Sequence, residues 1–120
     1  MKQFSLLVRV PNTYTAEQAK LVHPQWNELI DKWKAAGVYI LSFAFPGESY
    51  TVSKTEKKIK RETVLSDDLK VVSNIVVRAE NMEQALELSK SCPTLLHEGT
   101  VEVREIPNPL PEAHHYRKTQ

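Results

Sequence analysis

The sequence predicts one α+β domain, in which helices cover one face of a β-sheet. Two kinds of pattern carry this prediction. Stretches such as 100–106, TVEVREI, alternate apolar and polar residues with a period of two, which is typical of a strand with two unlike faces. The stretches 15–37 and 80–92 instead place apolar residues at helical spacing. A chain of 120 residues is long enough to bury a core as one domain without disulfides or metal.

The first strand and the first helix have clear signals in the sequence. In FSLLVRV, 4–10, the even-numbered residues are all apolar and predict the face that packs on the core. Thr15 and Gln18 have the spacing of a capping box at the start of the helix. Pro24 predicts a kink or a break near His23, because proline removes a backbone donor and clashes with the preceding turn.

The second helix is shorter and amphipathic. It should begin after Asn81 as its N-cap and end at Pro93. The residues expected to point inward are Met82, Ala85, Leu86 and Leu88.

The remaining segments are strands and a tail. Residues 38–45, VYILSFAF, are apolar on both faces, which predicts a strand that is covered on both. The more polar segments 50–53 and 58–64 predict a hairpin at an edge of the sheet. Further strands are expected at 71–79 and 100–106, followed by a proline-containing C-terminal tail at 107–120.

The order of these elements predicts a ferredoxin-like domain, β-α-β-β-α-β, with a hairpin inserted between its second and third core strands. The domain covers residues 1–106. In this arrangement the first strand is central, beside the last strand and the third core strand. The helices cover one face only, so the other face is open.

The open face combines charged and apolar residues. Arg9, Glu102 and Arg104 are expected there, together with Asn74 and Arg78 of the third core strand. The second strand should add large apolar side chains to the same face, and such a patch is uncommon on a monomer. We therefore expect a homodimer in which two sheets pack face to face. Tyr39, Leu41, Phe43 and Phe45 are expected to share one face of this strand, and three of these four large side chains would make up the patch.

Composition and charge exclude several classes of protein. Sixteen Lys and Arg residues against fifteen Asp and Glu give a net charge of +1, which offers no surface for nucleic acid. No run of about 18 apolar residues is present, so no membrane-spanning helix is expected. Cys92 is the single cysteine and the N-terminus lacks a signal-peptide pattern, which favours a cytoplasmic protein. One Cys and scattered His do not form a metal site, and no cofactor is expected.

Four segments of the chain resemble a known family. They are LLVRV, WKAAGVYI, AENMEQALELSKSCP and VEVREI, in that order. On these segments the chain resembles the YCII-related proteins, in particular the DGPF branch, over about residues 3–106. The spacing Ala-Leu-x-x-x-x-x-Cys-Pro followed by Val-Glu-Val-Arg is the most specific part of the match. The resemblance implies a dimeric α/β barrel built on a ferredoxin-like domain.

The resemblance also bears on activity. Most family members have no assigned activity. A few relatives are dehydrochlorinase-like or isomerase-like enzymes acting on small aromatic acids and lactones, and others accompany sigma factors. The core YCII proteins are proposed to use a His–Asp pair, with the His in the first helix. That position falls on His23, or on Trp26 when counted back from Gly37, and the Asp has no counterpart here. Where the DGPF branch has Asp-Gly-Pro-Phe, this chain reads KRETVLSDD.

Five residues are candidates for a ligand site. His23 could act as a general base, because an imidazole titrates near neutral pH; the alternative is a polar residue beside a helix kink. Arg9 and Arg104 could bind a carboxylate, whereas the alternative is an ion-pair network with Glu102. Trp26 could stack on a ligand, although core packing is the commoner role of such a residue.

These residues lead to two hypotheses of function. The first is a dimeric protein that binds a small anionic or aromatic metabolite. The second is a cofactor-independent lyase or isomerase, in which His23 moves a proton while Arg9 or Arg104 holds the substrate carboxylate.

Overall fold

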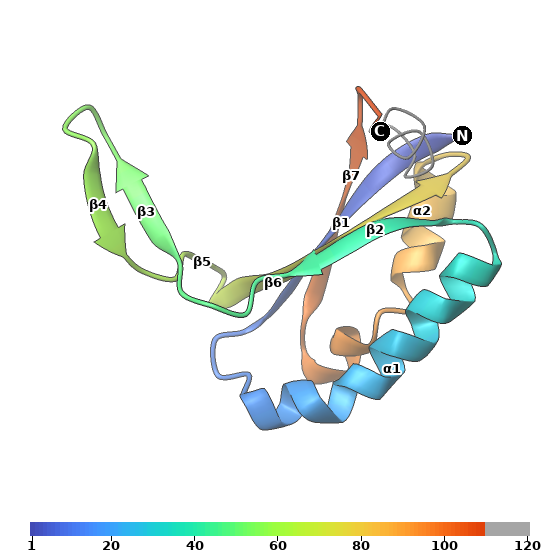
Figure 1. Ribbon diagram of the computed structural model, residues 1–120, viewed down its shortest axis with the longest axis horizontal. Coiled ribbons are helices and arrows are strands. Elements are labelled where there is room, and N and C mark those ends of the chain that lie inside the picture. Colours follow the sequence, from blue (N-terminus) through green and yellow to red (C-terminus); the bar gives the residue numbers. More distant parts are fainter. Residues whose placement is uncertain (110–120) are drawn as a thin grey trace, which may run out of the picture.

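The computed structural model describes residues 1–109 and confirms a mixed α+β fold (Figure 1). A main sheet carries the helices on one side, and a small separate sheet projects away from it. Of the expected tail, the structure describes only residues 107–109, and residues 110–120 lie outside the described part. The elements are β1 (Lys2–Pro11), α1 (Ala16–Ala35), β2 (Tyr39–Ala44), β3 (Tyr50–Ser53), β4 (Lys58–Arg61), β5 (Leu65–Ser66), β6 (Leu69–Ala79), α2 (Met82–Ser89), the 3₁₀ helix η1 (Pro93–His97) and β7 (Thr100–Ile106).

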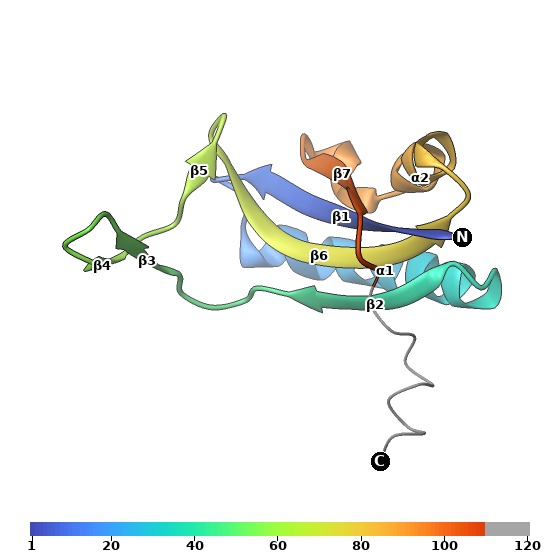
Figure 2. The same ribbon diagram turned by 90° about the horizontal axis from the view of Figure 1, so that it is seen from above.

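The main sheet has the strand order β2-β6-β1-β7, and every neighbouring pair is antiparallel. The short strand β5 pairs with the start of β6 and extends the sheet at that end. Strand β1 is therefore held on both sides, by β6 and by β7. Figure 2 shows the long curved strand β6 beneath β1, with α1 packed along the sheet.

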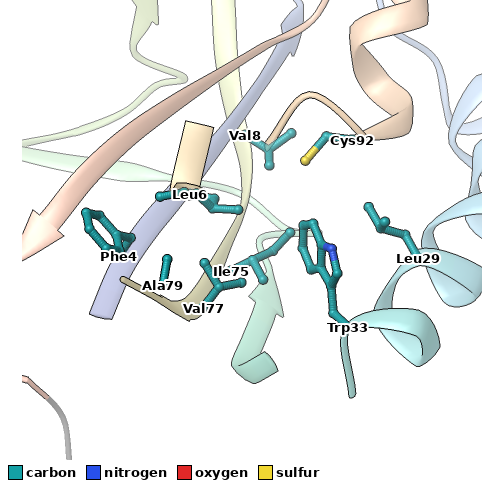
Figure 3. Packing of buried hydrophobic residues seen from close by; sticks show 10 residues of the cluster. Phe4, Leu6, Val8, Leu29, Trp33, Ile75, Val77, Ala79 and Cys92 are labelled. Atoms are coloured by element: carbon teal, nitrogen blue, oxygen red, sulfur yellow. The ribbon is translucent and has the colours of Figure 1, made fainter. Parts of the chain in front are cut away.

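The core lies between the sheet and the helices. Phe4, Leu6 and Val8 of β1 have no exposed surface, as the period of two predicted. Leu6 lies opposite Ile75 on β6 and opposite Val103 on β7, so these side chains share one face. Figure 3 shows the side chains of β1 and β6 facing Leu29 and Trp33 of α1. The core cluster is completed by Leu29, Trp33, Val77, Ala79, Ala85 and Cys92.

Helix α1 confirms the capping box but not a break at proline. The Thr15 hydroxyl accepts a hydrogen bond from the Gln18 amide, and the Gln18 side chain accepts one from the Thr15 amide. Pro24 lies inside a single helix that continues to Ala35, so of the kink or break expected near His23 the break does not occur. Pro24 is exposed, and burial of residues such as Trp33 on the opposite side holds the two halves in one helix.

Helix α2 begins after Asn81, whose side chain accepts a hydrogen bond from the Gln84 amide, as expected. Ala85 is buried and Leu88 packs on the core. Met82 and Leu86 are 38% and 44% exposed, so the expectation that they point inward was wrong. A helix this short has room for only one row of side chains against the sheet, and Ala85, Leu88 and the buried Ser89 form that row.

A bulge in β2 changes which residues share a face. Tyr39 lies opposite Val77 and Leu41 lies opposite Val76, so Ile40 is an extra residue. Tyr39 therefore points to the helices, and the Lys34 ammonium lies 5.2 Å from the centre of its ring. The expectation that Tyr39 shares a face with Leu41, Phe43 and Phe45 was wrong.

The predicted hairpin forms but lies apart from the main sheet. Strands β3 and β4 pair only with each other, and Figure 1 shows them projecting well beyond the body of the molecule. We call residues 50–61 the arm. The arm leaves the sheet after β2 and returns to it through β5.

No helix within residues 1–109 is long and apolar enough to cross a membrane.

Candidate functional site

A cavity of about 570 Å³ lies between the first half of α1 and the neighbouring ends of β2 and β6. Its walls are largely apolar, and a volume of this size suits a small organic molecule. The aromatic residues that line it on the helix side are Tyr14 before the helix and Trp26 on α1. Phe43 also borders the cavity, but its place opposite Asn74 puts its side chain on the open face of the sheet.

Lys70 is the one permanently charged residue among the described residues that line this cavity. The described residues around the cavity include no Asp or Glu, and Lys70 makes no ion pair within residues 1–109. Lys70 is partly buried at the start of β6, opposite Val10 on the helix side of the sheet. An ammonium group in an apolar wall without a carboxylate partner favours binding of an anion.

Thr94 of η1 supplies a second polar group beside the cavity. The residue is only 3% exposed, and its hydroxyl oxygen has no hydrogen-bond partner in the part of the chain that is described. Buried hydroxyls are seldom left unpaired. Tyr14 lies against the ring of His97, and burial raises the pKa of the Tyr14 hydroxyl, which keeps it protonated.

The structure places His23 and Trp26 together at this cavity, one turn apart on α1. His23 is exposed, whereas Trp26 is partly buried and also packs on the core. A histidine acting as a general base is usually oriented by a carboxylate. The lack of Asp and Glu among the described residues around the cavity leaves His23 without such a partner.

Arg9, Glu102 and Arg104 meet on the other face of the sheet. Arg9 Nη1 donates to Glu102 Oε1 at 2.7 Å, and Arg104 Nε donates to Glu102 Oε2 at 2.6 Å. The hydrogen bond from Arg9 and then that from Arg104 lower the pKa of the Glu102 carboxyl. Both guanidinium groups are thus engaged by one carboxylate, which is the ion-pair network named above as the alternative to a ligand site.

The five candidate residues therefore form two separate groups. His23 and Trp26 lie on the helix side of the sheet, while Arg9 and its two partners lie on the open side. Within one chain, the sheet separates His23 from Arg9 and Arg104. A single site that uses His23 and either arginine is not formed by one chain.

The carboxyl of Glu102 should titrate at a lower pH than an ordinary glutamate, whose pKa is 4.5. Its folded-state pKa is depressed, so the stabilisation is present above the unfolded pKa and is lost as pH falls through the folded value. In an NMR titration, Arg9→Gln should raise the Glu102 pKa toward the ordinary value. Lys20→Gln, on the exposed side of α1, should leave it unchanged; equal titration of Glu102 in wild type and Arg9→Gln would contradict the network.

Cys92 is structural. It is 2% exposed, and burial raises the pKa of its thiol to about 12. A thiol that stays protonated at neutral pH is a poor nucleophile, so packing is its role here.

The sequence did not point to Lys70 or Thr94. Lys70 precedes the run of apolar residues that marked the third core strand, and Thr94 follows Pro93 in a loop-like segment. Both come to the cavity only through tertiary packing. Tyr14, in the turn before α1, carried no signal beyond turn chemistry.

Comparison with known proteins finds distant structural similarity only among solved structures. No protein-family model matches the chain, and no curated protein matches it. Among solved structures, the chain is similar to GlnK of B. subtilis in its ATP complex, with a TM-score of 0.42 and 16% sequence identity. The match covers 91% of this chain and 85% of the GlnK chain. A similarity of this size does not identify a family or a function.

Proposed function

We propose that the chain binds a small aromatic or aliphatic carboxylate in the cavity between α1 and the main sheet. The observation that carries this proposal is that Tyr14 and Trp26 line the cavity together with Lys70, whose ammonium makes no ion pair within residues 1–109. The aromatic side chains supply the apolar contact and Lys70 supplies the counter-charge. The Thr94 hydroxyl, which has no hydrogen-bond partner within residues 1–109, supports a ligand that carries a further polar atom.

We also propose that the protein is a ferredoxin-like domain of the YCII-related type that forms a dimeric α/β barrel. The strand order β2-β6-β1-β7 and the single helix-covered face support the domain type. Phe43 and Phe45 support the dimer, because both are about half exposed and contact each other edge to face at 5.5 Å. A second copy packed on this face would remove them from water.

An enzymatic role for His23 is the alternative. One observation favours it, since the imidazole lies at the cavity that would hold the ligand. The missing carboxylate partner argues for binding without turnover. In this alternative, His23 would act as a base without an orienting carboxylate from the protein, or the carboxylate of the ligand itself would orient the imidazole.

Wild-type protein should melt at a higher temperature in the presence of benzoate, phenylacetate or hexanoate, and the shift should be lost in Lys70→Met. A ligand at about 100 times its dissociation constant adds about 2.7 kcal/mol, or several degrees for a domain of this size. Benzamide and phenylacetamide should give smaller shifts, because they lack the charge. Lys20→Met is the matched control, since this exposed lysine of α1 does not border the cavity.

Equal shifts in wild type and Lys70→Met would contradict the proposed site, as would no shift with any carboxylate. His23→Ala separates the two roles. A binding protein keeps most of its affinity in this variant, whereas an enzyme that uses His23 as its base loses about 10²–10⁴-fold in turnover.

A further inference from the structure

The arm exposes an apolar side that nothing within residues 1–109 covers. Val52 lies directly opposite Ile59, and Tyr50 lies opposite Arg61 on the same side of the ribbon. Tyr50, Val52 and Ile59 are 60%, 64% and 73% exposed. A two-stranded hairpin alone in water is marginally stable at best, so the arm is expected to pack on another surface.

The distribution of charge indicates what that surface is. Residues 54–61 carry five Lys and Arg side chains and one Glu, whereas residues 80–106 carry six Glu side chains and only Lys90 and Arg104 as cations. We call residues 80–106, which hold α2, η1 and β7, the acidic segment. Within residues 1–109 several of these charges make no ion pair: Lys54, Lys57 and Lys58 on the arm, and Glu80, Glu83 and Glu98 on the acidic segment.

The arm and the acidic segment of one chain do not meet. Both views place the arm at one end of the molecule and α2 at the other (Figures 1 and 2). The acidic segment also offers apolar contact, because Met82 and Leu86 are exposed on α2. The strands of the arm and helix α2 also have similar lengths, because a four-residue strand spans about 14 Å and an eight-residue helix about 12 Å.

We propose that the arm of one chain docks on the acidic segment of a second copy, which returns the same contact in a two-fold dimer. The apolar side of the arm packs beside α2, and the arm lysines pair with Glu80 and Glu83. Two complementary surfaces on one chain make a second copy the partner that satisfies both at once. This contact adds to the sheet-face packing proposed above and does not depend on ligand binding in the cavity.

Charge reversal tests the contact by sedimentation equilibrium at low salt. The arm variant is Lys57→Glu/Lys58→Glu, and the acidic-segment variant is Glu80→Lys/Glu83→Lys. Each alone should raise the dimer dissociation constant about 10-fold or more, because like charges then face each other twice per dimer. Combining all four substitutions in one chain should restore association, and an equimolar mixture of the two variants should form a heterodimer tighter than either homodimer.

Lys20→Glu/Lys32→Glu on α1 is the matched control for the arm variant, because it changes the net charge by the same amount and in the same direction. It should leave the dissociation constant within about threefold of wild type. Far-UV circular dichroism and melting confirm that each variant is folded. Unchanged association in the arm variant, failure of the four-substitution chain to recover, or a wild type that is monomeric at all concentrations would each overturn the proposal. Loss of association in Phe43→Asp with none in the arm variant would assign the dimer to the sheet face alone. Melting shifts caused by carboxylates test the cavity between α1 and the sheet, and their outcome does not affect this proposal.

Discussion

Leu6→Ala is expected to lower the free energy of unfolding by about 3 kcal/mol, which lies within the usual cost of truncating a buried leucine to alanine. Leu6 has no exposed surface and sits at the centre of β1, with Ile75 on one side and Val103 on the other. The substitution removes apolar contact and leaves a cavity that a strand held on both edges cannot close. Urea unfolding, monitored by circular dichroism, measures the loss.

Leu96→Ala is the matched control for this prediction, because Leu96 is 81% exposed on η1 and the side chain removed is the same. It should change the free energy of unfolding by no more than about 0.5 kcal/mol. The melting temperature should fall by roughly 10 °C in Leu6→Ala and hardly at all in Leu96→Ala. Similar losses in the two variants would mean that β1 is not the centre of the core.

The sequence could predict those parts of the fold that depend on local patterns. The alternation in β1 separates Phe4, Leu6 and Val8 from Arg9, and the structure buries the first three and leaves Arg9 on the open face. The cap at Thr15 likewise depends only on residues within one turn. Such features can be predicted from the local sequence without knowing which other elements pack on them.

Other features depended on packing that no local pattern reports. The bulge at Ile40 turns Tyr39 to the helix side, although nothing in the segment 38–45, which is apolar on both faces, indicates a bulge. Met82 and Leu86 have helical spacing suited to a core, but Ala85 and Leu88 of the same helix take the contact with the sheet. These exposed residues of α2 are the ones that the proposed contact with the arm would cover.

The candidate site could be predicted only in fragments. The spacing of Glu102 and Arg104 on one face of a strand implied that they would meet Arg9 on a neighbouring strand, and they do. The cavity instead joins α1, the end of β2, the start of β6 and η1, four segments far apart in the sequence. His23 and Trp26 could be found from the helix, whereas Lys70 and Thr94 depended on how these segments pack.

Gly99→Ala is expected to lower the free energy of unfolding by about 3 kcal/mol, the upper end of the usual cost of overpacking. A Cβ atom here would lie 2.7 Å from the Arg9 carbonyl oxygen and 2.8 Å from the Thr94 carbonyl oxygen. Both neighbours are backbone, so neither can rotate away; β1 or η1 must shift, which would also displace Thr94 beside the cavity and weaken carboxylate binding. Gly47→Ala is the control, with no atom within 4 Å of its Cβ, and its stability should stay within about 1 kcal/mol of wild type. Equal stability of the two variants in urea unfolding would show that the junction of η1 and β7 is looser than these distances imply.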